Sequence, residues 1–160
     1  MDLACREARM EDAELLWRWA SDAETRRNAF SKSAIAFEEH VAWLERRLHS
    51  DATRIWIFSD GDVPVGQVRF DIEGDRAEID IAVAPERRGR GLGRAMLGEA
   101  VRRLHAERGA RARPTASVLE DNVRSLRMFR ACRFKEVGVV RRDTGERAIV
   151  LTLDADATTA

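Results

Sequence analysis

Glycine and arginine are interleaved through residues 87–94, in a segment whose composition suits the binding of an anion. The run stands between an apolar segment at 77–84 and a segment at 94–107 whose apolar residues have helical spacing. The first N–H groups of a helix have no partner within the helix and lie at the positive end of its dipole. Glycines let the backbone come close to a diphosphate and adopt positive φ angles. The run therefore predicts a phosphate-binding turn at the start of a helix.

The spacing of the glycines excludes the two commonest nucleotide motifs. A Rossmann fingerprint needs G-x-G-x-x-G, whereas the glycines here are Gly89, Gly91 and Gly93. A P-loop needs Lys followed by Ser or Thr after its last glycine, and Arg94-Ala95 stands there instead. A glycine-rich loop with solvated arginines is the simpler alternative.

The hydrophobic pattern indicates the scaffold that positions this turn, an α+β fold with a mixed sheet of about seven strands and about four helices. Strands are expected at residues 3–9, 54–59, 65–72, 77–84, 115–119, 134–140 and 147–153. Helices are expected at 10–20, 37–48, 94–107 and 122–132, and the polar segment 21–33 is expected to be irregular. Phe37, Val41, Leu44 and Leu48 mark the apolar stripe of the 37–48 helix. Three hairpin strands precede a strand–helix–strand crossover, which requires one parallel pair.

Length and composition bound the class of protein. The 160 residues fit one domain, expected at 1–153, with a small polar tail at 154–160 that frays. Lys+Arg and Asp+Glu number 28 each, and this balance argues against a nucleic-acid partner. We expect a cytoplasmic protein without a membrane partner, because neither a membrane-length apolar run nor a signal peptide is seen. Cys5 and Cys132 form no CxxC pair and are interpreted as reduced thiols, and no metal site is expected.

Two strings stand out, one at the predicted turn and one in the helix predicted at 122–132. They read Arg88-x-x-Gly91-x-Gly93 and Asn122-x-x-Ser125-x-x-x-Phe129-x-x-x-Arg133-Phe134. Together and in this order, they resemble the coenzyme A motif and the second motif of the GNAT superfamily of N-acetyltransferases. With the strand order, the resemblance covers nearly the whole chain. It implies the GNAT fold and an enzyme that transfers an acetyl group from acetyl-CoA to an amine by direct attack in a ternary complex.

The resemblance also implies where the cofactor, acetyl-CoA, lies. The end of the 77–84 strand would pair with the pantetheine arm, and the amides of the turn would bind the pyrophosphate. Asn122 would contact the pantetheine or orient its helix, although Asn before a helix is also an ordinary N-cap. The implied cofactor residues are Ile81, Ala82, Val83, Arg88, Gly89, Arg90, Gly91, Leu92, Gly93, Arg94, Asn122, Ser125 and Phe129.

The implied reaction needs a base, because an alkylammonium must lose a proton before its nitrogen can attack a thioester. Glu78 and Asp80 are the candidate bases, and Asn122 is a further catalytic candidate from the family motif. Because Glu78 and Asp80 alternate with isoleucines, the alternative is that they face solvent or pair with arginines. Backbone amides around Ile81 and Ala82 would polarise the thioester carbonyl.

Phe129 and Arg133 depart from the family pattern. Tyrosine is usual at the position of Phe129 and often protonates the leaving thiolate, but this chain contains no tyrosine. Either another acid acts or the thiolate leaves unassisted, which a thiol pKa of ~8.5 permits. Arg133 stands where glycine is usual, which suggests a less tight exit from the helix.

Candidate acceptor residues lie in the region of the first two predicted helices: Arg26, Asn28, Phe30, His40 and Trp43. The region is similar to the branch of the family that acetylates nucleotide-linked amino sugars, as in pseudaminic acid synthesis. Arginines could bind a diphosphate, and aromatic rings could stack on a base or a sugar. His40 and Trp43 lie off the apolar stripe, and for them surface or inter-helix packing is the alternative.

The acceptor class therefore stays open at the level of sequence. A small-molecule amine, with an amino sugar favoured, is the first hypothesis. A protein N-terminus is the second, because residues 77–80 also resemble the ribosomal-protein branch. A coenzyme A-binding module without catalysis is the third, motivated by Phe129. The family resemblance also allows a homodimer.

Overall fold

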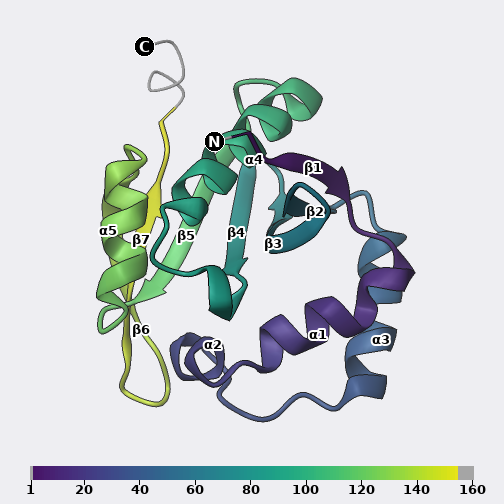
Figure 1. Ribbon diagram of the computed structural model, residues 1–160. Coiled ribbons are helices and arrows are strands. Elements are labelled where there is room, and N and C mark those ends of the chain that lie inside the picture. The colour runs from purple at the N-terminus through teal and green to yellow at the C-terminus, as the bar shows by residue number, and fades with distance from the viewer. Residues whose placement is uncertain (1, 155–160) are drawn as a thin grey trace.

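Seven strands form one mixed sheet in the computed structural model, which describes residues 2–154 (Figure 1). The strand order is β1-β2-β3-β4-β5-β7-β6, and the predicted α+β class is confirmed. The strands are β1 (Ala4–Glu7), β2 (Thr53–Asp60), β3 (Val63–Glu73), β4 (Arg76–Val83), β5 (Arg113–Leu119), β6 (Lys135–Arg141) and β7 (Arg147–Thr152). The helices are α1 (Ala13–Ser21), α2 (Ala23–Asn28), α3 (Phe37–Leu48), α4 (Leu92–Arg108) and α5 (Val123–Ala131), with short 3-10 turns η1 (Met10–Asp12) and η2 (Pro85–Arg87).

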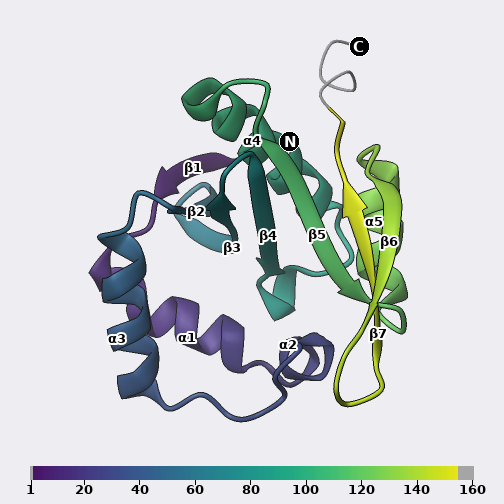
Figure 2. The ribbon, with the colours of Figure 1, turned by 180° about the vertical axis from the view of Figure 1, so that it is seen from behind.

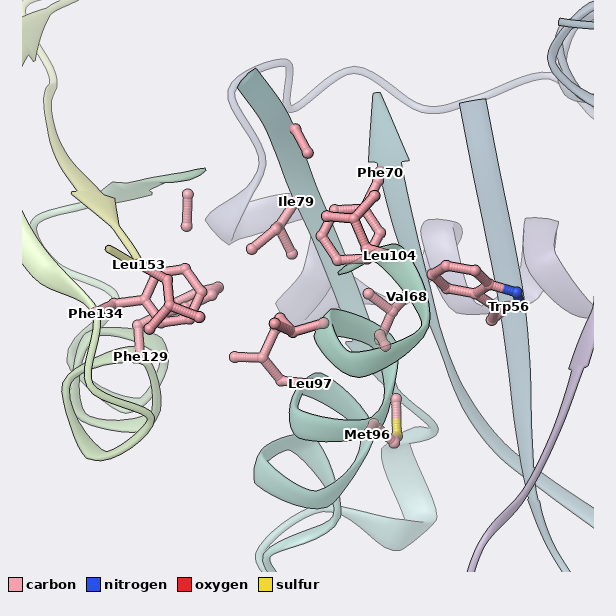
Figure 3. Close-up of a cluster of buried hydrophobic side chains, with 14 of the residues drawn as sticks. Trp56, Val68, Phe70, Ile79, Met96, Leu97, Leu104, Phe129, Phe134 and Leu153 are labelled. Carbon is pink, nitrogen blue, oxygen red and sulfur yellow. The ribbon is translucent and has the colours of Figure 1, made fainter. Parts of the chain in front are cut away.

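Helices cover both faces of the sheet (Figures 1 and 2). Trp56 and Phe58 of β2 belong to the larger core, which includes residues of α4 and α5. Ile55 and Ile57 belong to the smaller core, which includes residues of α1 and α3. Because side chains alternate in direction along a strand, β2 is buried on both faces. Figure 3 shows the larger core, with Leu97 of α4 among the side chains that face the sheet.

β4 and β5 are the parallel pair that the crossover predicts, and their ladder covers only the first part of each strand. It runs from Arg76 opposite Arg113 to Glu78 opposite Thr115. Beyond these residues the two strands diverge, as Figure 2 shows. The rest of β4 stays paired with β3 as far as Val83, and the rest of β5 stays paired with β7. The sheet therefore opens between its central strands while its outer ladders remain intact.

The segment predicted to be irregular, 21–33, contains the helix α2, so there are five α-helices among residues 2–154 rather than about four. None of the residues of α2 is buried, so the helix carries no apolar stripe that periodicity could reveal. It starts at Asp22, whose side chain accepts a hydrogen bond from the Thr25 amide at 3.2 Å. An Asp at the N-cap position is a sequence signal for the start of a helix, and it is easily overlooked in a segment that is polar throughout.

The buried face of α3 also differs from the predicted stripe. Leu44 is fully buried as expected, but Phe37 is 36% exposed, whereas His40 is only 6% exposed. Trp17 of α1 lies edge-on to Phe37, with ring centroids 5.3 Å apart. His40 instead lies near Arg69 of the sheet. Burial, and then the charge of Arg69, lower the pKa of His40. The orientation of α3 is thus set jointly by α1 and by the sheet.

The structure also bears on membrane-spanning helices, metal-binding groups and the two cysteines. None of the helices within residues 2–154 combines the length and apolar character needed to cross a bilayer. The same residues contain no group of three or more His, Cys, Asp or Glu placed to hold a metal ion. Cys5 and Cys132 are free, and burial raises the pKa of both thiols. Most of the predicted frayed tail, 155–160, lies outside the described residues.

Candidate active site

A cavity of about 520 Å³ lies where β4 and β5 diverge, and we call it the cofactor cavity. The second half of β4, the turn before α4, the end of β5 and the first turns of α5 form its walls. Twelve of the thirteen predicted cofactor residues line it: Ile81, Ala82, Val83, Arg88, Gly89, Gly91, Leu92, Gly93, Arg94, Asn122, Ser125 and Phe129. Arg90 does not line it and is exposed. The structure therefore brings these twelve residues together around one continuous cavity.

The turn before α4 has the backbone geometry of an anion site. Gly89 and Gly91 have φ angles of 77° and 75°, which side chains disfavour. Gly91 is the N-cap of α4 and offers no side chain to the amides of the first turn. Those amides have no acceptor within the helix and point into the space beyond its end. They are therefore available to a diphosphate.

Gly93 differs from Gly89 and Gly91 because α5 approaches it closely. A Cβ atom at this position would lie 2.8 Å from the Met128 sulfur and 3.6 Å from a Val83 methyl group. The absence of a side chain at Gly93 thus allows α4, α5 and β4 to converge around the cavity.

Charge in the cofactor cavity suits a polyanion. Six arginines and two carboxylates line it: Arg26, Arg87, Arg88, Arg94, Arg124, Arg127, Glu24 and Asp80. Arg88 itself does not point freely into the cavity, because its guanidinium binds Asp22 and Glu24 of the α2 region, each at 2.7 Å. Sequence reasoning gave no sign of this contact, since the partners lie more than sixty residues away.

The α5 motif residues have both structural and cavity-lining positions. The Asn122 carboxamide oxygen accepts a hydrogen bond from the Ser125 amide at 3.2 Å, so Asn122 caps α5 while it lines the cofactor cavity. Phe129 is 2% exposed and lies edge-on to Phe134, with ring centroids 5.1 Å apart. It contributes shape and no proton. Ser117 of β5 also lines the cavity, although nothing in the sequence distinguishes it from an ordinary strand residue.

A second cavity of about 650 Å³ lies on the other face of β4, between α1, α3 and the sheet, and we call it the acceptor cavity. Its walls include the predicted residues Arg26, His40 and Trp43. The two cavities share lining residues at the middle of β4 and on α2: Asp80, Ile81, Ala82, Thr25 and Arg26. The two cavities therefore adjoin at this segment of β4.

Asp80 and Glu78, the two candidate bases, occupy different environments. Asp80 lines both cavities, and its Oδ2 accepts a hydrogen bond from the buried Gln67 amide at 2.8 Å. Arg69 Nη1 lies 3.8 Å from the same oxygen. Glu78 lines neither cavity and forms an ion pair with Arg76 at 2.7 Å. The geometry therefore separates two carboxylates that the sequence could not distinguish.

An aromatic and cationic group forms one wall of the acceptor cavity. The His40 and Trp43 rings are 5.3 Å apart, and the Arg69 guanidinium lies 4.9 Å from the Trp43 ring centroid. Burial, and then the charge of Arg69, lower the pKa of His40. His40 Nε2 is buried without a hydrogen-bond partner among the described residues, which also favours the neutral ring. Gln67 and Arg69 were not predicted, because alternating polar residues on a strand usually face solvent.

Of the three other predicted acceptor residues, Arg26 lines the acceptor cavity and Asn28 and Phe30 do not. Arg26 lines both cavities, but its guanidinium also donates to the carbonyls of Ala20 at 2.6 Å and Ser31 at 3.1 Å. Asn28 lines the cofactor cavity instead. Phe30 lines neither cavity and lies under the Arg142 guanidinium, 4.2 Å from it. Phe30 therefore packs against the turn between β6 and β7.

Comparisons with known proteins concern the family and the fold of the chain. The model of the acetyltransferase (GNAT) family matches residues 13–134. Spermidine N-acetyltransferase from Vibrio cholerae, solved with CoA and spermine, is similar with a TM-score of 0.87 and 17% identity, over 99% of this chain and 98% of that chain. Ribosomal-protein-alanine N-acetyltransferase from Brucella melitensis has a TM-score of 0.78 and 21% identity, over 94% of this chain and 99% of that chain. An N-acetyltransferase from Staphylococcus aureus Mu50 has a TM-score of 0.80 and 19% identity, over 97% and 99%. No match is found among the curated proteins.

Proposed function

Since the chain belongs to the acetyltransferase (GNAT) family and is an acetyl-CoA-dependent N-acetyltransferase, we propose that it acetylates the primary amine of an anionic small molecule. The acceptor that we favour is a nucleotide-linked amino sugar. The observation that carries the proposal is the meeting of the two cavities at Asp80–Ala82 of β4. One cavity has the features of a coenzyme A site, and the other has room for an acceptor beside it.

The residues of the cofactor cavity fit acetyl-CoA, which supplies a thioester carbonyl open to attack by an amine. The amides of Gly89–Arg94, with the arginines around them, would hold the diphosphate. Beyond Glu78, the edge of β4 toward β5 has no strand partner among the described residues. The backbone of Ile81–Val83 can therefore pair with the pantetheine arm as an added strand would. Amides around Ile81 would polarise the carbonyl.

We assign the role of base to Asp80. The hydrogen bond from Gln67 fixes one carboxylate oxygen, and a side-chain exposure of 52% leaves room for a water between Asp80 and the amine. Asp80 would accept the amine proton through that water, which would leave the nitrogen lone pair free for attack. Phe129 offers no proton to the leaving group, which would depart as a thiolate, a tolerable leaving group near neutral pH.

The charge of the acceptor cavity supports an anionic acceptor. Arg26, Arg46 and Arg69 line it against Glu39 and Asp80, so cations outnumber carboxylates. A polyamine would be better served by the opposite balance. Trp43 and His40 offer ring faces on which a base or a sugar can stack.

A thiol-release assay with acetyl-CoA tests the proposal on a matched panel of amines. The panel contains a nucleotide-linked 4-amino-dideoxy sugar, the same sugar without its nucleotide, spermidine, and a peptide with an N-terminal alanine. We expect kcat/KM to be highest for the nucleotide-linked sugar and at least about tenfold lower without the nucleotide. Turnover of the peptide or spermidine alone would refute the acceptor class. Binding of acetyl-CoA without turnover of any amine would instead indicate a module that has lost catalysis.

A further inference from the structure

Arg88 joins the cofactor turn to α2 through a cluster of charges, which we call the Arg88 cluster. Its guanidinium donates to Asp22 Oδ2 and to Glu24 Oε2, each at 2.7 Å, and to Thr25 Oγ1 at 3.2 Å. Arg88 and Asp22 are each only 20% exposed. Arg124 of α5 lies 3.2 Å from the other oxygen of Glu24. The cluster therefore connects the turn, α2 and α5 at one point.

α2 depends on such polar contacts for its position. The helix has six residues and none of them is buried, so apolar packing fixes it weakly. Arg26 donates hydrogen bonds to the Ala20 and Ser31 carbonyls near the helix. Arg88 connects α2 to the cofactor turn and Arg124 connects it to α5, and Figures 1 and 2 show α2 beside the turn that follows β4.

The position of α2 matters for both cavities. Thr25 and Arg26 line the acceptor cavity and the cofactor cavity, and Asn28 lines the cofactor cavity. A shift of α2 thus changes the shape of the acceptor cavity. The turn at the other end of the contact is where a diphosphate would bind, next to the left-handed Gly89.

We propose that Arg88 is a positioning residue that fixes α2 to the cofactor turn, so that filling the cofactor cavity orders the wall of the acceptor cavity. The proposal rests on the cofactor assignment above. A diphosphate on the amides of the turn holds the backbone beside Arg88, and Arg88 holds Asp22 and Glu24 in turn. Because coupling between two sites is reciprocal, an occupied acceptor cavity also strengthens coenzyme A binding by the same factor.

Arg88 has a second effect that the experiment must separate from positioning. Asp22 and Glu24 stand near a polyanion site, and Arg88 neutralises them. Arg88→Met alone would therefore weaken coenzyme A binding by exposing the site to two carboxylates. The triple variant Arg88→Met/Asp22→Asn/Glu24→Gln removes the positive charge of Arg88 and the negative charges of both carboxylates, so no unpaired carboxylate is left near the site. Asparagine at position 22 still caps α2, because its side-chain oxygen accepts the Thr25 amide hydrogen bond as Asp22 does.

Hydrogen exchange with coenzyme A as the probe tests the proposal in the full chain. Saturating coenzyme A should slow exchange of the α2 amides, 23–28, by about tenfold in the wild type and by less than about twofold in the triple variant. Calorimetric titration measures the Kd of each protein for coenzyme A, so that exchange in the triple variant and in the wild type is compared at saturation. The matched control Arg90→Met, on the same turn but outside the cavity lining, should keep the slowing of α2 exchange at saturation.

Equal slowing of α2 exchange in the triple variant and the wild type would overturn the proposal. So would coenzyme A binding to the wild type without any slowing at α2, and that result would leave the proposed function intact. Failure of the wild type to bind coenzyme A would instead defeat the cofactor assignment, and the proposal with it. If the triple variant loses cooperative unfolding, Asp22→Asn/Glu24→Gln removes both ion pairs of the cluster with Arg88 in place, and weaker slowing of α2 exchange than in the wild type is expected.

Discussion

Gly91→Ala tests whether the left-handed turn at the start of α4 presents the diphosphate-binding amides. Gly91 is the N-cap of α4 with φ 75° and ψ 6°. A Cβ atom there would meet nothing within 4 Å, so the change introduces no clash. What remains is the cost of a left-handed residue that is not glycine, about 1–2 kcal/mol. The substitution therefore isolates backbone conformation from packing.

The strain at position 91 can affect either of two measured quantities. If the turn relaxes in the free protein, coenzyme A must restore the left-handed conformation on binding. Since every 1.4 kcal/mol is tenfold, the Kd then rises by about five- to thirtyfold. If the turn stays left-handed, the free energy of unfolding falls by about 1–2 kcal/mol instead. The loss of binding free energy and the loss of unfolding free energy should together equal the conformational strain of about 1–2 kcal/mol.

Gly98→Ala is the matched control, because it makes the same chemical change on the same helix. Gly98 is exposed, and a Cβ atom there would also meet nothing within 4 Å. Alanine should raise the free energy of unfolding by about 0.8–1 kcal/mol through its higher helix propensity, with no change in coenzyme A affinity. Calorimetric titration and urea unfolding measure both quantities. The reasoning is refuted if Gly91→Ala matches the wild type in both, or if Gly98→Ala weakens coenzyme A binding equally.

Three further predictions concern β4 and the acceptor cavity. Asp80→Asn should lower kcat by about 100-fold with coenzyme A affinity retained, whereas Glu78→Gln should change kcat by less than about twofold; equal losses would contradict the assignment of the base. Trp43→Ala should raise the KM for the acceptor by about tenfold without changing the KM for acetyl-CoA, measured by thiol release. Burial, and to a lesser extent the charge of Arg69, lower the pKa of His40 below its usual 6.5 in the folded protein. The imidazole therefore binds a proton more readily in the unfolded chain. The associated stability is therefore fully present above about pH 6.5 and falls as the pH drops below it; His40→Gln should flatten this slope in urea titrations, and an unchanged slope would contradict it.

The donor side of the site could be predicted because its information is local. The turn needs glycines at Gly89 and Gly91 for positive φ, and it needs a strand before it and a helix after it. All of these requirements fall within one short stretch of chain. Asn122 could be predicted for the same reason, because an N-cap residue is adjacent in sequence to the helix that it caps.

The interactions that escaped prediction join distant segments. Nothing in the sequence around Arg88 indicates that its partners are Asp22 and Glu24. The apolar stripe of α3 predicted that Phe37 is buried and that His40 lies off the core face. In the structure Phe37 is partly exposed beside Trp17 of α1, and His40 is buried. Helical periodicity describes the helix and not its neighbours, so it misplaces residues wherever two neighbours compete.

The contrast between the two cavities explains why the family is easier to identify than the acceptor. The cofactor cavity offers backbone amides, so its sequence requirement is concentrated at Gly89 and Gly91, whose positive φ angles shape the turn just before α4. The acceptor cavity selects through side chains that come from separate elements, such as Trp43 of α3, Arg69 of β3 and Asp80 of β4. Each of these residues is an unremarkable polar or aromatic residue within its own segment. Acceptor specificity is therefore a property of the folded arrangement, and it can change by substitution at these positions while the cofactor turn stays the same.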